Sequence, residues 1–450
     1  KDNAIQDLIK KFGLIDDEKK ENWLNDPNGL VWVEGKWHLF FQHNPEATVW
    51  GNMTWGHAIS DDLVHWRQVE HALYPDALGT MYSGSAVVDH EGTAGFGEGA
   101  VLAFYTAAGE HAKPRQTYTQ CLAVSQDDGV TWEKYADNPV VNHIECANRD
   151  PKVIWHKPSQ RWVMALYLAE DRFCLMRSTD AKSWERFQDV TLPGVSECPD
   201  FFPLKDDAGD EQWVFWGAKG GYQLGQFDGD QFVPHTELLT AEYGRNGYAA
   251  QTYSNAPDGR IIQVSWMSGG QYPEMPFNQQ MSVPMELTLA GTGADARLSR
   301  VPVSELESLR ARSSTIDDVK INEGTPFIAD TDARLIDVSL TLTPCDSGQL
   351  VVSVRGQPLV VDWGSKELRF QNGAVDLGRL RDQRADAELK IQLLVDLTSV
   401  EVFLNEGEIS GCFCFLPGAY IHPLVLMARG ATQEVLRVTL FELRSSWNRS

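Results

Sequence analysis

Three acidic residues in the first half of the chain lie in short segments typical of turns, each beside or near a proline. Asp26 lies in "WLNDPNG", Asp150 in "RDPKV" and Glu197 in "ECPD". Each segment alone favours a structural role, because Asp, Asn, Gly and Pro are ordinary turn residues. Together they suggest chemistry. One carboxyl group of a pair can protonate a leaving oxygen while the other attacks an anomeric carbon or activates water, as glycoside hydrolysis requires.

The elements that would position these acids recur along the first 300 residues. Strand-like runs rich in aromatic and β-branched residues are followed by polar turns ending in an aromatic residue: "SDDLVHW" at Trp66, "SQDDGVTW" at Trp132, "STDAKSW" at Trp184 and, more loosely, "QFDGDQF" at Phe232. A fifth run begins at Arg260 without a clear turn of this kind. Five units of about four short strands predict a five-bladed β-propeller with one sheet per blade. We interpret the recurring aromatic residues as packing between blades.

Each repeat unit opens with a further short strand, and the three acids stand at the starts of such strands. In a propeller the first strand of each blade lines the central channel, so equivalent strand ends meet in one funnel. Bringing like charges together in a partly dry site costs free energy, and turn formation does not require it. A function is therefore the better explanation, with Arg149 as a candidate counter-charge.

The neighbours of the acids suit a sugar. Flat aromatic faces and neutral hydrogen-bonding groups are supplied by Trp23, Trp50, Trp55, Asn25, Gln42 and Ser83. Taken singly, each is more often structural, because large aromatic residues mostly pack cores. In combination with the three acids they favour carbohydrate binding.

Composition narrows the class of protein. A chain of 450 residues exceeds what one hydrophobic core usually supports, so two domains are expected. The formal net charge of −24 argues against a nucleic acid or an anionic membrane surface as partner, and no apolar run is long enough to cross a bilayer. The seven cysteines form no CxxC pair and no zinc-ligand spacing, so neither a metal nor another cofactor is predicted. The oligomeric state is left open.

The segments outside the repeats complete the predicted organisation. Residues 1–300 form the propeller, of which 1–20 are an N-terminal extension that reads as a short amphipathic helix with Ile5, Leu8 and Ile9 on one face and Asn3 as its cap. The charged segment 301–315 is expected to be a helical linker. From residue 316 to 450 alternating strands separated by Gly, Asp and Asn turns predict a β-sandwich.

Five motifs in order resemble glycoside hydrolase family 32, which includes invertases, levanases and exo-inulinases: "WLNDPNG", "FQHNP", "YSGS", "RDPKV" and "ECPD". The resemblance implies that Asp26 is the nucleophile, that Glu197 is the general acid/base, and that Asp150 holds fructose hydroxyls and stabilises the transition state. It also implies that the fructosyl pocket is lined by Arg149, Asn25, Gln42, Trp50, Trp55 and Ser83. The segment before Trp23 lacks the Arg-Pro pattern that usually precedes the first motif.

The activity implied by the resemblance is that of a retaining, exo-acting glycoside hydrolase that releases terminal β-D-fructosyl units from sucrose, inulin or levan. Retention predicts that the Asp26 and Glu197 carboxyl groups lie about 5–5.5 Å apart. Three alternatives stay open: fructosyl transfer by the same acids, an inverting arabinan- or xylan-cleaving propeller, and a carbohydrate-binding propeller without turnover. A secreted or periplasmic location is favoured over a cytoplasmic one, which also stays open.

Overall fold

The computed structural model describes residues 21–418 and 422–447, which divide into two compact units. Unit 1 contains the described residues up to Ala241, together with Gly247–Ser268 and Tyr272–Leu298. Unit 2 contains Glu242–Asn246, Gly269–Gln271 and the described residues from Ser299 onward. The expected N-terminal helix, with Ile5, Leu8 and Ile9, lies outside the described residues. In the described part of the chain, no helix combines the length and apolar character needed to span a membrane.

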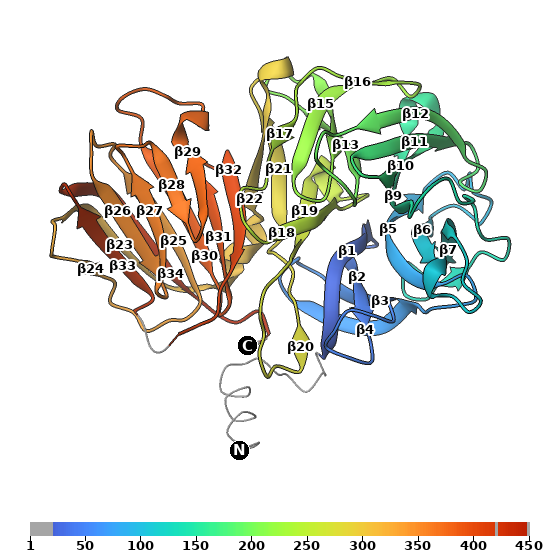
Figure 1. Ribbon diagram of the computed structural model, residues 1–450, viewed down its shortest axis with the longest axis horizontal. Coiled ribbons are helices and arrows are strands. Elements are labelled where there is room, and N and C mark those ends of the chain that lie inside the picture. Colours follow the sequence, from blue (N-terminus) through green and yellow to red (C-terminus); the bar gives the residue numbers. More distant parts are fainter. Residues whose placement is uncertain (1–20, 419–421, 448–450) are drawn as a thin grey trace. The chain divides into compact units, whose positions relative to one another are not determined.

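The first two blades of unit 1 are antiparallel sheets of strands that follow one another in sequence (Figure 1). Blade I consists of β1 (Asn22–Val33), β2 (Lys36–Asn44), β3 (Thr54–Ser60) and β4 (Trp66–Leu73), with the short β20 (Phe277–Asn278) parallel to β1. Blade II consists of β5 (Thr80–Asp89), β6 (Ala100–Ala108), β7 (Tyr118–Ser125) and β8 (Glu133–Lys134). The 3-10 helix η1 (Gly109–His111) follows β6.

The remaining three blades repeat this order. Blade III consists of β9 (Arg149–His156), β10 (Arg161–Ala169), β11 (Arg172–Ser178) and β12 (Glu185–Thr191). Blade IV consists of β13 (Asp200–Lys205), β14 (Glu211–Trp216), β15 (Gly221–Phe227) and β16 (Phe232–Pro234), with β17 (Leu239–Thr240) pairing with β15. Blade V consists of β18 (Gly247–Thr252), β19 (Ile261–Met267), β21 (Met285–Ala290) and β22 (Arg297–Pro302). The prediction of a five-bladed propeller is confirmed. Single-turn 3-10 helices lie at η2 (Lys157–Ser159), η3 (Pro257–Gly259) and η4 (Gly293–Asp295).

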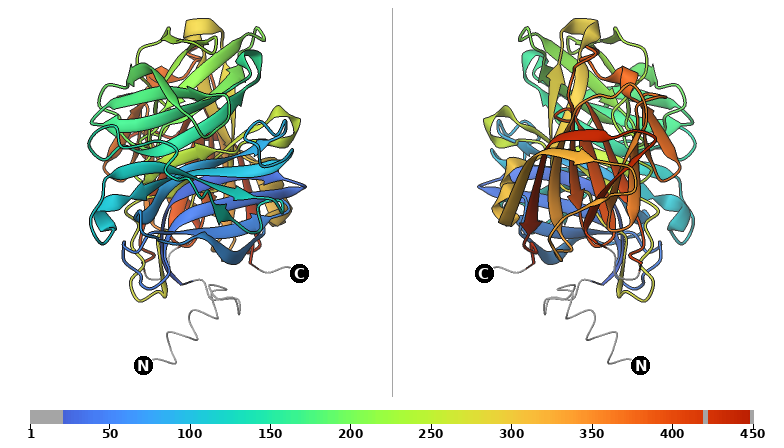
Figure 2. Two further views of the ribbon diagram at one scale, coloured as in Figure 1. Left: turned by 90° about the vertical axis from the view of Figure 1, so that its right-hand side faces the viewer. Right: turned by 90° about the vertical axis from the view of Figure 1, so that its left-hand side faces the viewer.

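The first strand of every blade lies closest to the centre of unit 1. Contacts link β1 to β5, β5 to β9, β9 to β13, β13 to β18 and β18 to β1, and the five strands surround the centre in Figure 1. The left panel of Figure 2 shows blades I to IV of unit 1, coloured from blue to green, following one another. The beginnings of these five strands therefore share one axis.

The recurring polar turns are locally closed. The turn aspartate accepts backbone N–H bonds from residues that follow it: Val64 and His65 at Asp62, Thr131 at Asp127, and Lys182 and Ser183 at Asp180. The indole N–H of the turn tryptophan donates to the carbonyl three residues earlier: Trp66 to Leu63, Trp132 to Gly129, and Trp184 to Ala181. Asp and Trp thus recur because each satisfies backbone groups of the turn.

Two of these tryptophans, Trp132 and Trp184, join neighbouring blades. Trp132 of blade II packs edge-on against Phe40 of β2, with ring centroids 5.4 Å apart. Trp184 of blade III packs in the same way against Phe104 of β6 at 5.7 Å. The interpretation of the recurring aromatic residues as packing between blades is confirmed for Trp132 and Trp184.

Unit 2 is formed by two six-stranded antiparallel sheets with a shared core, which confirms the predicted β-sandwich. One sheet contains, in spatial order, β23 (Arg310–Ile321), β34 (Gln433–Leu443), β25 (Ile336–Leu342), β30 (Leu389–Val395), β31 (Ser399–Leu404) and β32 (Ile409–Cys414). The other contains β24 (Phe327–Ile328), β33 (Leu424–Arg429), β26 (Gln349–Val354), β27 (Gln357–Asp362), β28 (Glu367–Phe370) and β29 (Gly373–Asp376). A 3-10 helix, η6 (Leu377–Arg379), follows β29. The right panel of Figure 2 turns unit 2, coloured orange to red, toward the viewer.

The segment expected as a helical linker, 301–315, differs from that expectation. It contains the end of β22, one short 3-10 helix, η5 (Ser304–Leu309), and the beginning of β23. Of the charged residues that suggested a helix, Glu305 and Glu307 lie on η5, whereas Arg310 and Arg312 lie on β23, whose backbone pairs with β34 from Arg310 to Ile321. From Arg310 onward, pairing with a long neighbouring strand overrides the helix propensity of the segment.

Candidate active site

The inner strands of unit 1 are irregular near their first residues. The pairing of β1 with β2 shifts register twice, between Leu24 and Pro27, an interval that contains Asp26, and again between Asn28 and Val31. The β5–β6 pair shifts between Met81 and Gly84, and the β9–β10 and β18–β19 pairs are also interrupted near the beginnings of β9 and β18. Bulges of this kind re-aim side chains and occur beside active sites.

Three site residues have an unusual backbone conformation. Asp150, Glu197 and Cys198 adopt positive φ angles of 65°, 62° and 40°. Residues other than glycine rarely adopt this left-handed region, at a cost on the order of 1–3 kcal/mol each. Such residues persist only where their surroundings fix them, and they cluster at functional sites.

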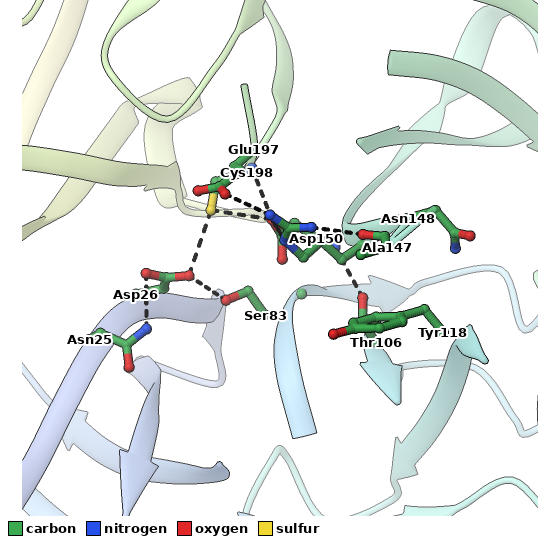
Figure 3. Close-up of polar contacts among 12 residues, drawn as sticks. Asn25, Asp26, Ser83, Thr106, Tyr118, Ala147, Asn148, Asp150, Glu197 and Cys198 are labelled. Atoms are coloured by element: carbon green, nitrogen blue, oxygen red, sulfur yellow. Dashed lines mark hydrogen bonds and ion pairs between the residues drawn. The ribbon is translucent and has the colours of Figure 1, made fainter. Parts of the chain in front are cut away.

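Asp26 is held by neutral donors (Figure 3). Its Oδ2 accepts a hydrogen bond from the Ser83 hydroxyl at 2.6 Å, and its Oδ1 accepts one from the Asn25 amide at 3.1 Å. The Asn25 amide oxygen in turn accepts the indole N–H of Trp23 at 2.8 Å. These bonds orient the carboxylate through neutral groups and not through a cation. Its negative charge is therefore available to an electrophile.

Glu197 is held by a cation and a phenol. The Arg149 guanidinium donates to Glu197 Oε1 at 2.6 Å and lies 3.7 Å from Asp150 Oδ2. The other oxygen, Oε2, accepts the hydroxyl of Tyr248 at 2.5 Å. Arg149 stacks over the Tyr167 ring at 4.7 Å, which fixes the guanidinium. The predicted counter-charge role of Arg149 therefore has a geometric basis.

Cys198 connects Asp150 with Asp26. Asp150 Oδ2 accepts the backbone N–H of Cys198 at 3.1 Å. The Cys198 sulfur lies 3.5 Å from Asp150 Oδ2 and 3.6 Å from Asp26 Oδ2, between the two carboxylates in Figure 3. Burial, reinforced by the surrounding acids, raises the pKa of the Cys198 thiol, so it remains a neutral, weak donor to both.

Burial and mutual repulsion raise the pKa values of two of the acids. Burial raises the pKa of Asp26, and the Glu197 charge adds to this, while the bonds from Ser83 and Asn25 oppose it. Burial raises the pKa of Asp150 to about 7, with Asp26 and Glu197 contributing, although Arg149 acts in the opposite direction. A site with this concentration of negative charge favours a positive charge that develops on a bound ligand.

The raised pKa of Asp150 predicts a pH-dependent stability. The folded chain binds this proton more tightly than the unfolded chain, so the contribution of Asp150 to stability is present at acid pH and is lost as pH rises from about 4 to about 7. We expect Asp150→Asn to become more stable than the wild type across that range, by on the order of 1 kcal/mol or more above pH 7. Chemical denaturation of both proteins at a series of pH values measures the difference, and a difference independent of pH would contradict the prediction.

Two predicted sugar-binding residues are enclosed. Trp55 has no exposed surface, packs against Phe40 and Tyr105 in the core, and donates its indole N–H to the Tyr82 carbonyl at 2.9 Å. Its ring leaves no face for a sugar, which corrects the expectation that it lines the fructosyl site. Gln42 is 2% exposed and donates to the Met81 carbonyl at 2.8 Å. Both residues support the Tyr82–Ser83 segment from behind.

Trp50, in contrast, is exposed and belongs to an aromatic group close to the acids. It packs edge-on against Tyr82 and His111, with centroids 6.0 and 5.8 Å away. The Tyr82 hydroxyl is 3.0 Å from His111 Nε2, and Tyr82 also contacts Tyr118. Tyr82 is the neighbour of Ser83, which binds Asp26. We call Trp50, Tyr82, His111 and Tyr118 the aromatic rim.

Sequence reasoning assigned no role to Tyr248 or Cys198. Tyr248 lies near the beginning of β18, the position at which the acids of other blades stand, and it packs edge-on against Trp266, whose centroid is 6.0 Å away. Its equivalence by position within the repeat was the signal available for finding it. In the described part of the chain, no group of three or more His, Cys, Asp or Glu residues is arranged to hold a metal ion.

Comparison with known proteins places this site in a family. Residues 18–302 match the glycosyl hydrolases family 32 N-terminal domain. The chain is 35% identical to a levanase of Bacillus subtilis, over 95% of this chain and 69% of the relative. The chain belongs to glycoside hydrolase family 32. A second family 32 relative is an extracellular exo-inulinase of Aspergillus awamori, which is 30% identical over 95% of this chain and 94% of its own length.

Solved structures agree with this assignment. The crystal structure of exo-inulinase from Aspergillus awamori superimposes with a TM-score of 0.84 at 26% identity, covering 95% of this chain and 97% of that one. A fructofuranosidase from Schwanniomyces occidentalis, solved with fructose, gives a TM-score of 0.83 at 26% identity, covering 94% and 96%. The chain is therefore a glycoside hydrolase of the β-fructofuranosidase type, which acts with retention, as the motifs predicted.

Proposed function

We propose that this family 32 enzyme hydrolyses terminal β-fructosyl units of fructans and sucrose, with Asp26 as nucleophile and Glu197 as general acid/base. The observation that carries the assignment of roles is the contrast between the two carboxyl groups. Asp26 is held by the neutral donors Ser83 and Asn25, whereas Glu197 contacts Arg149 and Tyr248. Two acids in different environments can perform different tasks at one pH.

In the first step Asp26 attacks the anomeric carbon of the fructosyl unit. The bond from that carbon to the leaving oxygen breaks, and Glu197 delivers a proton to this oxygen, so the leaving sugar departs as a neutral alcohol. A covalent fructosyl ester on Asp26 remains. The hydrogen bonds from Ser83 and Asn25 orient the attacking carboxylate. Because both donors are neutral, the carboxylate keeps its charge and can act as a nucleophile.

In the second step Glu197, now deprotonated, takes a proton from a water molecule. The water oxygen attacks the anomeric carbon and the ester bond to Asp26 breaks, which regenerates both carboxyl groups. Two inversions give net retention of configuration. Burial raises the pKa of the Tyr248 phenol, so Tyr248 stays protonated. It can therefore donate a hydrogen bond to Glu197 while Glu197 acts as the base.

Asp150 is proposed to bind fructose hydroxyls beside the reacting carbon. Its carboxylate accepts the backbone N–H of Cys198, whose sulfur also contacts Asp26. This position suits a hydrogen-bond acceptor whose bond to the sugar strengthens as positive charge develops on the ring. Arg149, Asn25 and Ser83 complete the group that orients the fructosyl unit. Gln42 and Trp55 are proposed to act indirectly, by supporting this group.

The aromatic rim supports a substrate longer than sucrose. When the terminal fructosyl unit occupies the acids, further sugars of a fructan extend outward, and exposed aromatic faces bind sugar rings well. Trp50 is 47% exposed and is the outermost member of the group. The levanase and exo-inulinase relatives are named for fructan cleavage, which favours the same substrate class here. An extracellular or periplasmic location fits a polymeric substrate and the relatives described as extracellular.

Product analysis tests the proposal. Incubated with levan or inulin, the enzyme is expected to release free fructose as the dominant early product, and sucrose should yield fructose and glucose. Chromatography of early time points on all three substrates gives the result, with Asp26→Asn as the blank. A ladder of oligosaccharides would contradict exo-cleavage, and a cyclic difructose without free fructose would indicate transfer in place of hydrolysis.

A further inference from the structure

A buried ion pair links two neighbouring inner strands of the propeller, a few residues along the chain from the acids. Lys152 of β9 and Asp200 of β13 lie 3.2 Å apart, with side chains 3% and 0% exposed. The Lys152 ammonium also donates to the carbonyl and hydroxyl of Thr252 in β18, at 2.7 and 3.2 Å. Asp200 accepts the backbone N–H of Thr252 at 2.6 Å. We call Lys152, Asp200 and Thr252 the axial clamp.

The axial clamp joins the same strands that carry the site. Lys152 follows Asp150 by two residues, and Asp200 follows Cys198 by two. β9 is therefore linked twice to β13 and the residues just before it, once by the bond from Cys198 N–H to Asp150 and once by the clamp. Blades IV and V are also linked twice, by the Tyr248–Glu197 bond and by the bond from Thr252 to Asp200.

Stability alone does not explain a buried ion pair at this place. Removing two charges from water costs several kcal/mol per ion, and apolar residues of similar volume are often as stable or more so. Burial lowers the pKa of Lys152, and the charge and hydrogen bond of Asp200 oppose this. Compared with apolar packing, the ion pair adds geometric specificity, because each of its hydrogen bonds fixes the position of one strand relative to another.

The backbone between the clamp and the acids needs strands that are held in fixed positions. Asp150, Glu197 and Cys198 all have left-handed φ angles, a conformation that persists only when the surrounding structure fixes it. The clamp anchors the chain two residues after Asp150 and Cys198, and three residues after Glu197. A shift of about 1 Å at a reacting group can lower the rate about 100-fold.

We propose that Lys152 and Asp200 are positioning residues of this enzyme, which hold Asp150 and Glu197 in the geometry of the reaction through the axial clamp. This rests on the roles proposed above for those two acids. The clamp itself does not touch the substrate. Its loss should therefore change the rate of the chemical steps more than the affinity for substrate.

The first test uses Lys152→Met and Asp200→Asn with sucrose as substrate. In protein shown to be folded by circular dichroism, at a temperature well below its melting transition, we expect kcat to fall about tenfold or more while KM changes less than about threefold. A wild-type kcat in either folded variant would overturn the proposal. An unchanged kcat with a raised KM would also overturn it.

A matched control exists in unit 2. Arg300 and Glu242 form another buried ion pair, 2.7 Å apart with side chains 1% and 3% exposed. Arg300→Met breaks a pair of similar burial outside the site. We expect Arg300→Met to lower the melting temperature while kcat per folded molecule stays within about twofold of the wild type. An equal loss of kcat in this control would show that breaking any buried pair suffices, and would overturn the positioning role.

Two further variants test the proposal if the unpaired charge in Lys152→Met or Asp200→Asn prevents folding. Lys152→Met combined with Asp200→Leu replaces the pair by apolar residues, and Thr252→Val removes only one acceptor from Lys152. We expect both to fold and to lose kcat, by about tenfold in the double variant and by less in Thr252→Val. Wild-type kcat in both overturns the proposal. The two proposals can fail separately. If Asp26→Asn and Glu197→Gln are inactive and a clamp variant is fully active, only the positioning role of the clamp is rejected. If Asp26→Asn is active, the catalytic roles proposed above are rejected.

Discussion

Asp26→Asn is expected to lower kcat for sucrose and fructans by on the order of 10⁴-fold or more. An amide keeps the size of the carboxylate and can still accept a hydrogen bond from Ser83, but it cannot form the covalent fructosyl ester. Substrate binding should persist, because Arg149, Asp150 and Ser83 are unchanged. Steady-state kinetics gives the loss in rate, and calorimetric titration with sucrose measures the remaining affinity.

A turn aspartate provides the control for Asp26. Asp62 accepts two backbone N–H bonds in the polar turn of blade I, and it is an acid of unit 1 without a place in the site. Asp62→Asn should lower the melting temperature and leave kcat near the wild-type value. Retention of more than about a hundredth of the wild-type kcat in Asp26→Asn would contradict its role as nucleophile.

Glu197→Gln is expected to lower kcat for sucrose by about 10²- to 10⁴-fold, the contribution typical of a general acid/base. The loss in the first step should depend on the leaving group. Sucrose needs a proton on its leaving oxygen, whereas p-nitrophenyl β-fructofuranoside releases a phenolate that does not. The second step still lacks its base. The variant should thus release a rapid burst of p-nitrophenol, about one equivalent per site, followed by slow turnover.

Rapid-mixing absorbance measurements detect the burst, and mass spectrometry detects the fructosyl ester that accumulates with it. Tyr248→Phe, which removes the donor to Glu197 Oε2, is a useful comparison because it leaves both carboxyl groups in place. Equal losses for sucrose and the p-nitrophenyl substrate, without a burst, would argue that Glu197 is not the general acid/base.

The acids could be predicted because their sequence context repeats. Asp26, Asp150 and Glu197 each stand beside or near proline at the start of a blade, so the repeat and the propeller geometry together place them on one axis. Tyr248 escaped this reasoning, since the fifth blade offers neither an acid nor a proline at that position. Its importance appears only when its hydroxyl is seen on Glu197.

The side of the strand on which each side chain near the site lies could not be predicted. Period-two alternation tells which residues share a face of a strand, but each register shift near the site changes that assignment. Trp55 lies next to such a shift in β3 and is turned into the core, whereas Trp50 is exposed. The segment 301–315 failed for a different reason, because its strand is specified by β34, more than 100 residues further along the chain.

The closure of the propeller ring has a kinetic consequence. Blades II to IV pair strands that are neighbours in sequence, so their contacts are local and should form early in folding. β1 instead meets β20 and β18 from the far end of unit 1: Asn22 pairs with Phe277, and the Leu30 N–H donates to Gln251. Closing a loop of this length is the slow step that such contacts require. Because Asp26 lies in β1, refolding enzyme should regain blade structure before it regains activity, with the nucleophile arriving last.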